Sequence, residues 1–415
     1  MRLDQARIFN LIERGNGTFP FFRDGTFLLA LRLFIFKLSY WAILLLCVMR
    51  WGSFGGFFPI LDWPQTTTRS YTTHFIVFDG AFYLSIAQTG YHTGNRDCAF
   101  YPLWPAVCKL LSWIPDVNLV VAGLLLANLF SLVGWLLIYR ITSKKFGTAA
   151  ASWALAFLLL FPGSIFYQFL YSESLFLFLL ALLWWGLETG KLWPTLVAAF
   201  LLPLTRPIGV FCFLPILWQI LSVSPPNWLK RKPGFYRLLG DQHYASQTDS
   251  SLRGWWLVLI PFCGWICYLL LMFVWTGNAF EGFVVQKYWG TNSVSHLWNL
   301  PKFFISWFTP DSWHAYRGSL LDRAVFTILV YCLPLIWKLD KRLIMWTYFL
   351  GIIPAMSGEF TSYTRYASSA FPLFIALGVF FAPQSRRWEG FGLLGIFAIL
   401  HISLVWRYVN FQWAG

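Results

Sequence analysis

The sequence predicts an all-α integral membrane protein that crosses the bilayer many times. Of its 415 residues, 58% are hydrophobic and only 12% are charged, whereas about a quarter of the residues of a soluble domain are charged. The apolar runs are continuous and of bilayer length, without the alternation that marks a β-barrel. Aromatic residues make up 21% of the chain, which fits many crossings because such rings favour the headgroup zone.

Apolar segments of about 15–20 residues predict eleven transmembrane helices. They are 28–49, 119–139, 148–166, 173–187, 192–205, 208–222, 255–275, 321–337, 343–357, 367–382 and 391–408. With the N-terminus in the cytoplasm, the inner segments carry 18 Lys and Arg residues and the outer ones 9, as retention of cationic loops in the cytoplasm requires.

Two places in this topology are weak. The two spans that flank Arg206 are short and contain Pro203, Pro207 and Pro215, so this pair can form a bent hairpin that lines a cavity. Lys37 and Arg32 interrupt the first span. We expect them to snorkel toward the inner face or to shift the start of the helix.

The topology divides the chain into four parts. These are a cytoplasmic amphipathic leader 1–27, an N-terminal transmembrane module 28–222 with a first outer loop 50–118, a basic cytoplasmic loop 223–254, and a C-terminal transmembrane module 255–415 with an outer loop 276–320. The net charge of +14 follows from short, scattered basic loops, so topology explains it and nucleic-acid binding is not expected. The seven cysteines form no cluster with histidines, and neither a metal nor another cofactor is expected.

Residues 78–105 in the first outer loop are the most informative stretch. The chain has only 17 acidic residues, and Asp79 and Asp97 lie here, where a carboxylate at a membrane boundary usually has a task. Apolar residues after Asp79 recur at helical spacing, which predicts a lateral helix along the bilayer surface. Asp79 would stand at its N-terminus, where the helix dipole favours the ionised form.

Further polar residues fall on the same predicted outer face. They are Glu173, Arg206, Gln286, Trp289 and Arg365. Each has an ordinary structural explanation: an arginine can be an interfacial anchor, Glu173 can cap a helix, and Gln286 can be a solvated loop residue. Their agreement on one face predicts a common site.

Several motifs, in order, resemble a known family. They are Phe78-Asp79-Gly80, Gly90-Tyr91, Asp97, Ala99-Phe100-Tyr101-Pro102-Leu103, Tyr171-Ser172-Glu173-Ser174-Leu175-Phe176, Arg206-Pro207-Ile208-Gly209 and Arg365-Tyr366. Together they resemble the phosphatidylinositol-glycan class V mannosyltransferases, which belong to the GT-C class of multispanning glycosyltransferases. The chain departs from the family pattern at Phe78, Asp97 and Pro207, and it lacks a histidine shortly after Asp79; since outer-loop contacts select the acceptor, the acceptor stays open.

The resemblance implies a GT-C-like fold, with 28–222 as the catalytic module, and inverting transfer of a sugar, with mannose favoured. The donor would be a polyprenyl-phosphate sugar and the acceptor a hydroxyl of a lipid-linked molecule or glycan. Asp79 would be the general base, with Asp97 orienting it or holding acceptor hydroxyls. Arg206 and Arg365 would bind the leaving phosphate. Glu173 would hold sugar hydroxyls or fix an arginine, and Tyr101, Gln286 and Trp289 would contact substrate.

Two other functions remain open from the sequence. A transporter or flippase of lipid-linked sugars would pair broken spans between two halves, and only the hairpin at Arg206 fits that pattern. A structural membrane subunit would leave the outer acids without a target, and the need for a partner subunit is undetermined. For the enzyme, we expect an extracytoplasmic active site in the plasma (inner) membrane of a prokaryote, with the endoplasmic reticulum membrane as the alternative.

Overall fold

The computed structural model describes residues 25–52, 71–223, 225, 254–289 and 294–415. Most of the predicted leader 1–27, nearly all of the basic loop 223–254 and residues 53–70 of the first outer loop lie outside this part of the chain. The described residues are almost wholly helical, and their one isolated β-bridge joins Ser312 to Ser319. The prediction of an all-α protein is therefore confirmed.

All eleven predicted apolar segments coincide with helical residues. The helices are α2 (Thr26–Trp51), α5 (Leu119–Phe146), α6 (Thr148–Leu160), α7 (Glu173–Thr189), α8 (Leu192–Thr205), α9 (Phe213–Val223), α12 (Ile260–Thr276), α15 (Leu320–Leu339), α16 (Leu343–Thr347) with α17 (Ile353–Ser357), α19 (Phe371–Phe381) and α20 (Arg387–Val409). Among the described residues, five helical stretches are long and apolar enough to cross a membrane: Thr26–Trp51, Leu119–Phe146, Trp255–Thr276, Leu320–Leu339 and Gln384–Val409. The chain is an integral membrane protein.

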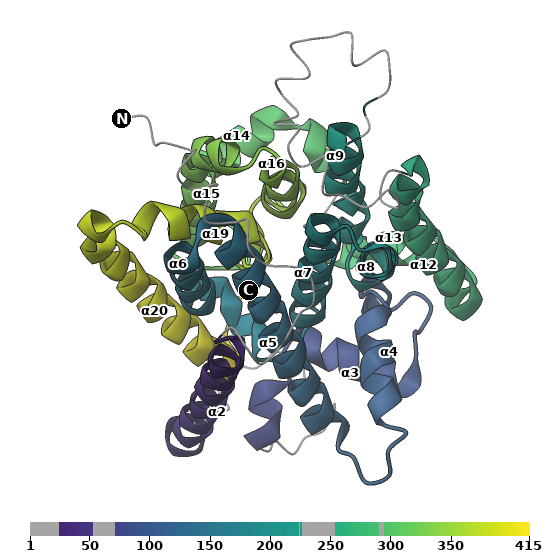
Figure 1. The fold of residues 1–415 in the computed structure, drawn as a ribbon. Helices are drawn as coiled ribbons and strands as arrows, with labels where there is room; N and C mark the ends of the chain where they lie inside the picture. Colours follow the sequence, from purple (N-terminus) through teal and green to yellow (C-terminus); the bar gives the residue numbers. More distant parts are fainter. Residues whose placement is uncertain (1–24, 53–70, 224, 226–253, 290–293) are drawn as a thin grey trace.

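Helix α7 lies at the centre of the bundle (Figure 1). It packs between α5 and α8, while α6 packs between α5 and α19. Twelve of its 17 residues are buried, whereas only five of the 26 residues of α2 are. Because α7 is enclosed by protein on most sides, its ends are fixed points, and each end carries a glutamate: Glu173 and Glu188.

Lys37 does not snorkel, so that expectation is wrong for this residue. Its side chain is buried in the middle of α2, and its Nζ donates to Asn128 Oδ1 at 2.9 Å and to Gln168 Oε1 at 3.0 Å. The ammonium also lies 4.2 Å from the centre of the Trp135 ring. Two amide oxygens and an aromatic face replace water around the charge, so the lysine docks α2 on α5.

The first outer loop contains four short helical elements after residue 70. They are the 3₁₀ helix η2 (Tyr71–Phe75), α3 (Asp79–Thr89), the 3₁₀ helix η3 (Arg96–Ala99) and α4 (Leu103–Leu111). The predicted helix after Asp79 is present, and its apolar face is buried, including Tyr83 and Ile86, while Gln88 and Thr89 are exposed. Asp79 is the first residue of α3, as the sequence predicted.

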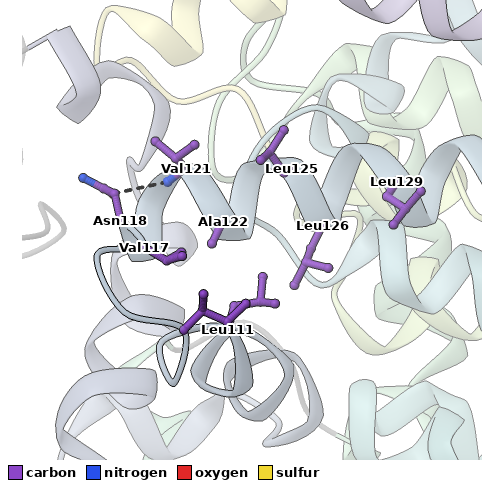
Figure 2. A pocket seen from close by; sticks show the side chains of 9 residues that line it. Leu111, Val117, Asn118, Val121, Ala122, Leu125, Leu126 and Leu129 are labelled. Carbon is purple, nitrogen blue, oxygen red and sulfur yellow. Dashed lines mark hydrogen bonds between the residues drawn. The ribbon is translucent and has the colours of Figure 1, made fainter.

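An apolar groove runs along the first turns of α5 (Figure 2). It has a volume of about 450 Å³ and lies between these turns, including Val121, Leu125 and Leu129, and the end of α4 at Leu111. Asn118 at its rim is occupied in capping α5, because its Oδ1 accepts from the Val120 amide at 2.9 Å. The groove suits hydrocarbon, and none of its lining residues belongs to the charged site described next.

Candidate active site

Four charged side chains from distant segments form one ion-pair chain, here called the Glu173 cluster: Asp79, Glu173, Arg206 and Arg365. Arg365 donates through Nη1 to Asp79 Oδ2 at 2.5 Å and through Nε to Glu173 Oε1. The same Oε1 lies 2.7 Å from Arg206 Nη1. The structure therefore brings together four of the residues that the sequence placed on one face. Negative and positive charges alternate along these ion pairs, in the order Asp79, Arg365, Glu173 and Arg206.

Each of the four residues stands at or near the end of a helix. Asp79 begins α3 and Glu173 begins α7, where the N-terminal dipole favours a carboxylate. Arg206 follows α8 directly, ahead of the 3₁₀ helix η5 (Pro207–Cys212). Arg365 lies within α18 (Tyr363–Ala367).

Two glycines allow the close backbone approaches that build the cluster. A Cβ on Gly163 would lie 2.0 Å from the carbonyl oxygen of Thr364, so only glycine lets the segment with Arg365 come this near. A Cβ on Gly209 would lie 2.2 Å from the carbonyl oxygen of Leu202. This gives a physical reason for the Arg-x-x-Gly motif, because the turn after Arg206 folds back against α8.

Aromatic rings enclose the two arginines. Arg365 Cζ lies 4.6 Å from the ring centre of Tyr171 and 5.0 Å from that of Phe166. Arg206 Cζ lies 4.8 Å from the ring centre of Tyr366. Such cation–π contacts stabilise a guanidinium that has lost water, and they hold each one in place for a second ligand.

Both arginines stay charged in this environment. Burial alone would lower the pKa of Arg206, but Glu173 holds that pKa above its ordinary value. Burial acts in the same direction on Arg365, where Asp79 and Glu173 together raise the pKa well above the usual range. The site thus combines fixed positive charge with a carboxylate, an arrangement that can bind an anion and accept a proton.

Access to solvent differs within the Glu173 cluster. The Asp79 side chain is 21% exposed, against 1% for Glu173. Glu173 Oε2 is buried and has no hydrogen-bond partner among the described residues. Asp79 is therefore the group that an incoming molecule can reach, and Glu173 keeps one acceptor atom unused.

Asp97 and Tyr101 lie in a neighbouring part of the first outer loop. Asp97 is buried in η3, and its Oδ2 lies 2.8 Å from His92 Nδ1. Tyr101 stacks on Tyr268 of α12, with ring centres 4.2 Å apart. Among the described residues, Asp97 forms this contact with His92 and no hydrogen bond with Asp79.

Trp289 contacts α3, and Gln286 lies three residues before it in the sequence. Gln286 is half-buried in the 3₁₀ helix η9 (Val285–Tyr288), which Trp289 follows. The Trp289 ring packs 5.6 Å from Phe82 and 5.7 Å from Phe100. Trp289 of the outer loop therefore packs against α3, the helix that begins with Asp79.

The sequence did not single out Asp322, which holds the segment that carries Arg365. Asp322 is fully buried in α15, and its Oδ1 accepts from the Thr364 backbone amide at 2.6 Å. Non-glycine residues with positive φ precede Arg365, namely Glu359, Phe360 and Ser362. The only sequence signal was an acid near the start of a span, which is equally typical of a helix cap.

Part of the chain that holds this site is similar to a known protein family. Residues 61–219 match the family model described as Mannosyltransferase (PIG-V). The chain is similar to the PIG-V family. The match confirms the resemblance found in the motifs, and the family it identifies is one of glycosyltransferases. Three members of the Glu173 cluster, Asp79, Glu173 and Arg206, lie in the PIG-V region, whereas Arg365 lies beyond it.

Two solved structures are similar in fold. ArnT from Cupriavidus metallidurans bound to undecaprenyl phosphate matches with 14% identity and a TM-score of 0.45, over 89% of this chain and 64% of that one. The oligosaccharyltransferase of Archaeoglobus fulgidus tethered with an acceptor peptide matches with 13% identity and a TM-score of 0.41, over 92% and 55%. This chain thus spans less than two thirds of either, and at these TM-scores neither similarity bears on its activity. No curated protein matches the chain by sequence.

Proposed function

We propose that this protein is a membrane glycosyltransferase. It transfers a sugar, with mannose favoured, from a polyprenyl-phosphate donor to a hydroxyl of a lipid-linked or glycan acceptor, with inversion at the anomeric carbon. The observation that carries the proposal is the Glu173 cluster, which sets an accessible carboxylate against two fixed guanidinium groups in a PIG-V-like chain.

Asp79 is the general base in this proposal. Its carboxylate takes the proton of the acceptor hydroxyl while that oxygen bonds to the anomeric carbon and the bond from that carbon to the phosphate oxygen breaks. The helix N-terminus at Asp79 supports the ionised form that a base requires. Its exposure, the highest in the cluster, leaves it open to an incoming hydroxyl.

Arg365 and Arg206 stabilise the leaving lipid phosphate. Cleavage converts a phosphodiester into a monoester and adds negative charge to the leaving group, so fixed cations favour the transition state over the bound donor. Arg365 is paired with Asp79 in the structure. A phosphate that binds Arg365 competes with this pair and frees Asp79 to act as base, which predicts that the donor binds before the acceptor.

Glu173 fixes the two arginines rather than binding the sugar through both of its oxygens. Its Oε1 contacts both guanidinium groups, so the alternative in which this glutamate fixes an arginine has direct geometric support. The unpartnered Oε2 is left to accept a hydroxyl of the bound sugar. In this proposal Asp97, Tyr101, Gln286 and Trp289 would contact the acceptor.

The membrane arrangement is part of the same proposal. Eleven crossings would place the Glu173 cluster on the extracytoplasmic face, with α3 lying along the bilayer surface and the fold resembling the GT-C class. The modules 28–222 and 255–415 would then both contribute to the site, because Arg365 comes from the second of them. A prokaryotic plasma membrane is favoured over the endoplasmic reticulum.

The test is product formation by the purified protein. Radiolabelled polyprenyl-phosphate mannose and a panel of lipid-linked and glycan acceptors are incubated with the protein in detergent, where no vesicle exists and transport gives no product. Labelled acceptor that depends on Asp79 supports the enzyme. Movement of labelled lipid across vesicles, without product under any condition, would establish the flippase instead.

A further inference from the structure

The chain after α20 turns back onto the candidate active site. This C-terminal segment, residues 410–415, is fixed at its turn: Arg407 Nε donates to the carbonyl of Trp413 at 2.8 Å, and the Gln412 amide donates to the carbonyl of Arg407 at 2.8 Å. Ala414 and Gly415 are buried. The sequence alone assigned these residues no role.

One contact of the C-terminal segment reaches the residue before Asp79. The Trp413 ring packs edge-on against Phe78, with ring centres 5.9 Å apart. Phe78 has φ of 57°, a left-handed conformation that costs free energy in a residue with a bulky side chain. This backbone conformation starts α3 and so sets the direction of the Asp79 side chain. Packing by the rings of Trp413 and Tyr408 holds the strained residue in place.

A second contact reaches the partner of Asp79. A Cβ on Gly415 would lie 3.7 Å from Arg365 Cδ and 3.4 Å from Phe166 Cζ, so the backbone of the segment lies beside the side chain of Arg365. Phe166 is one of the rings that flank the Arg365 guanidinium. The C-terminal segment thus touches the supports of both partners of the Asp79–Arg365 ion pair.

A third contact ties the segment to the outer loop. The Trp413 ring packs 4.8 Å from Tyr316, whose hydroxyl donates to the Trp289 carbonyl at 2.9 Å. Trp289 in turn packs on Phe82 of α3. A continuous row of aromatic residues therefore runs from the C-terminal segment to the helix that carries Asp79.

We infer that the C-terminal segment positions the Asp79–Arg365 pair, with Trp413 acting on the base through Phe78. This inference rests on the proposed function. Trp413 itself is a positioning residue and contacts neither of the reacting groups. A loosened site would admit water in place of the acceptor: the water oxygen bonds to the anomeric carbon, Asp79 takes its proton, and the lipid phosphate leaves with the electron pair of the broken bond. The products would be free sugar and lipid phosphate.

The experiment measures transfer and donor hydrolysis in Trp413→Ala, Trp413→Phe and the control Trp388→Ala, whose side chain is 85% exposed at the far end of α20. We expect Trp413→Ala to lower kcat for transfer about tenfold or more and to raise the ratio of hydrolysis to transfer. Trp413→Phe, which keeps a ring against Phe78, should stay within about threefold of the parent in both readouts. The control should match the parent protein.

A double variant decides whether Trp413 acts through Phe78. Combining Phe78→Ala with Trp413→Ala should lower kcat no further than Phe78→Ala alone, because the two residues would form one unit. Independent losses that multiply, or an unchanged hydrolysis ratio in Trp413→Ala, would overturn the inference. So would equal losses of kcat in the Ala and Phe variants. Absence of transfer by the parent protein would instead count against the proposed function itself.

Discussion

Helix α7 carries a glutamate near each end, and the two glutamates organise two different charged clusters. The first is the Glu173 cluster. The second, here the Glu188 cluster, consists of Lys145, Glu188, Asp340 and Arg342. The two glutamates are 15 residues apart on one helix, which corresponds to about 22 Å. Each cluster has two acidic and two basic residues, so neither composition nor net charge distinguishes the two clusters.

The two clusters differ in how their acidic side chains are paired and exposed. In the Glu188 cluster Arg342 contacts Asp340 through two parallel bonds, Nε to Oδ1 at 3.0 Å and Nη2 to Oδ2 at 2.7 Å. Lys145 bridges Glu188 at 2.8 Å and Asp340 at 2.7 Å. In the Glu173 cluster, by contrast, Glu173 leaves Oε2 without a partner and Asp79 is partly exposed. The comparison indicates that the paired contacts of the Glu188 cluster lock loops together, whereas the Glu173 cluster, with a buried carboxylate oxygen that has no partner among the described residues, is left open to a ligand.

The largest expected effect is on the transfer rate, which should depend on the Glu173 cluster and not on the Glu188 cluster. Asp79→Asn should lower the transfer rate by about 10²–10⁴-fold, because the amide cannot accept the acceptor proton. Folding should be little changed, since Arg365 keeps its bond to Glu173. Asp340→Asn is the matched control in the Glu188 cluster, and its transfer rate per folded molecule should equal that of the parent. Rates are measured on equal amounts of monodisperse protein; full activity of Asp79→Asn would remove it from the base role.

Replacing the glutamates of α7 sharpens the comparison. Glu173→Gln removes the carboxylate that pairs with Arg206, and Glu188→Gln removes one of the two carboxylates that pair with Lys145 and Arg342. Loss of one partner from a buried ion pair costs up to about 3–5 kcal/mol of folding free energy. Both should lower the thermal midpoint of unfolding. Only Glu173→Gln should also lower kcat per folded molecule, because it removes the carboxylate that holds Arg206 and Arg365 beside each other. If Glu188→Gln impaired kcat to the same extent, the distinction between the clusters would fail.

The two ends of the molecule should also respond differently to pH. Burial, together with the Arg407 guanidinium, lowers the pKa of His314 from 6.5 to about 4. Because His314 is buried in its neutral form, its contribution to the free energy of unfolding is complete above pH 6.5. This contribution, about 3 kcal/mol, is lost as the pH falls from 6.5 toward 4. His314 lies against the residues that anchor the C-terminal segment, since its carbonyl accepts from Arg407 Nη2 at 3.4 Å.

In the Glu188 cluster the sign is the same but the pH window is lower. Burial would raise the pKa of Asp340, but Lys145 and Arg342 hold it well below its usual range. Its stabilisation is therefore complete above the ordinary aspartate pKa of about 4 and is lost only as the pH falls further. The thermal midpoint of unfolding should therefore fall between pH 7 and pH 4 in the parent protein, and it should fall less in His314→Gln. Identical slopes in the two proteins would show that another group titrates in this range.

Much of this fold was predictable because helical periods and charge bias are local properties of the sequence. The apolar segments, the helix at Asp79 and the gathering of Glu173, Arg206 and Arg365 on one face all followed from them. The ion pair between Asp79 and Arg365 could not be predicted, since these residues are 286 positions apart and only packing defines their contact. Lys37 was misjudged for the same reason: its partners Asn128 and Gln168 come from other parts of the chain.

The other residues that the sequence could not single out act through the backbone. Gly163 matters because of a carbonyl from residue 364, and Asp322 because of an amide from the same residue. Trp413 matters because of the ring of Phe78. None of these has a spacing pattern, and each looks like an ordinary glycine, helix cap or interfacial ring until the tertiary contact is seen.

The most direct test of the difference between the clusters is binding of the leaving group, which requires no knowledge of the sugar or the acceptor. A fluorescent polyprenyl phosphate is titrated into the parent protein, Arg365→Ala and Arg342→Ala in nanodiscs. Binding should weaken at least about tenfold in Arg365→Ala, which corresponds to about 1.4 kcal/mol, and should be unchanged in Arg342→Ala. Equal affinities in all three proteins would contradict the claim that the Glu173 cluster is the phosphate site.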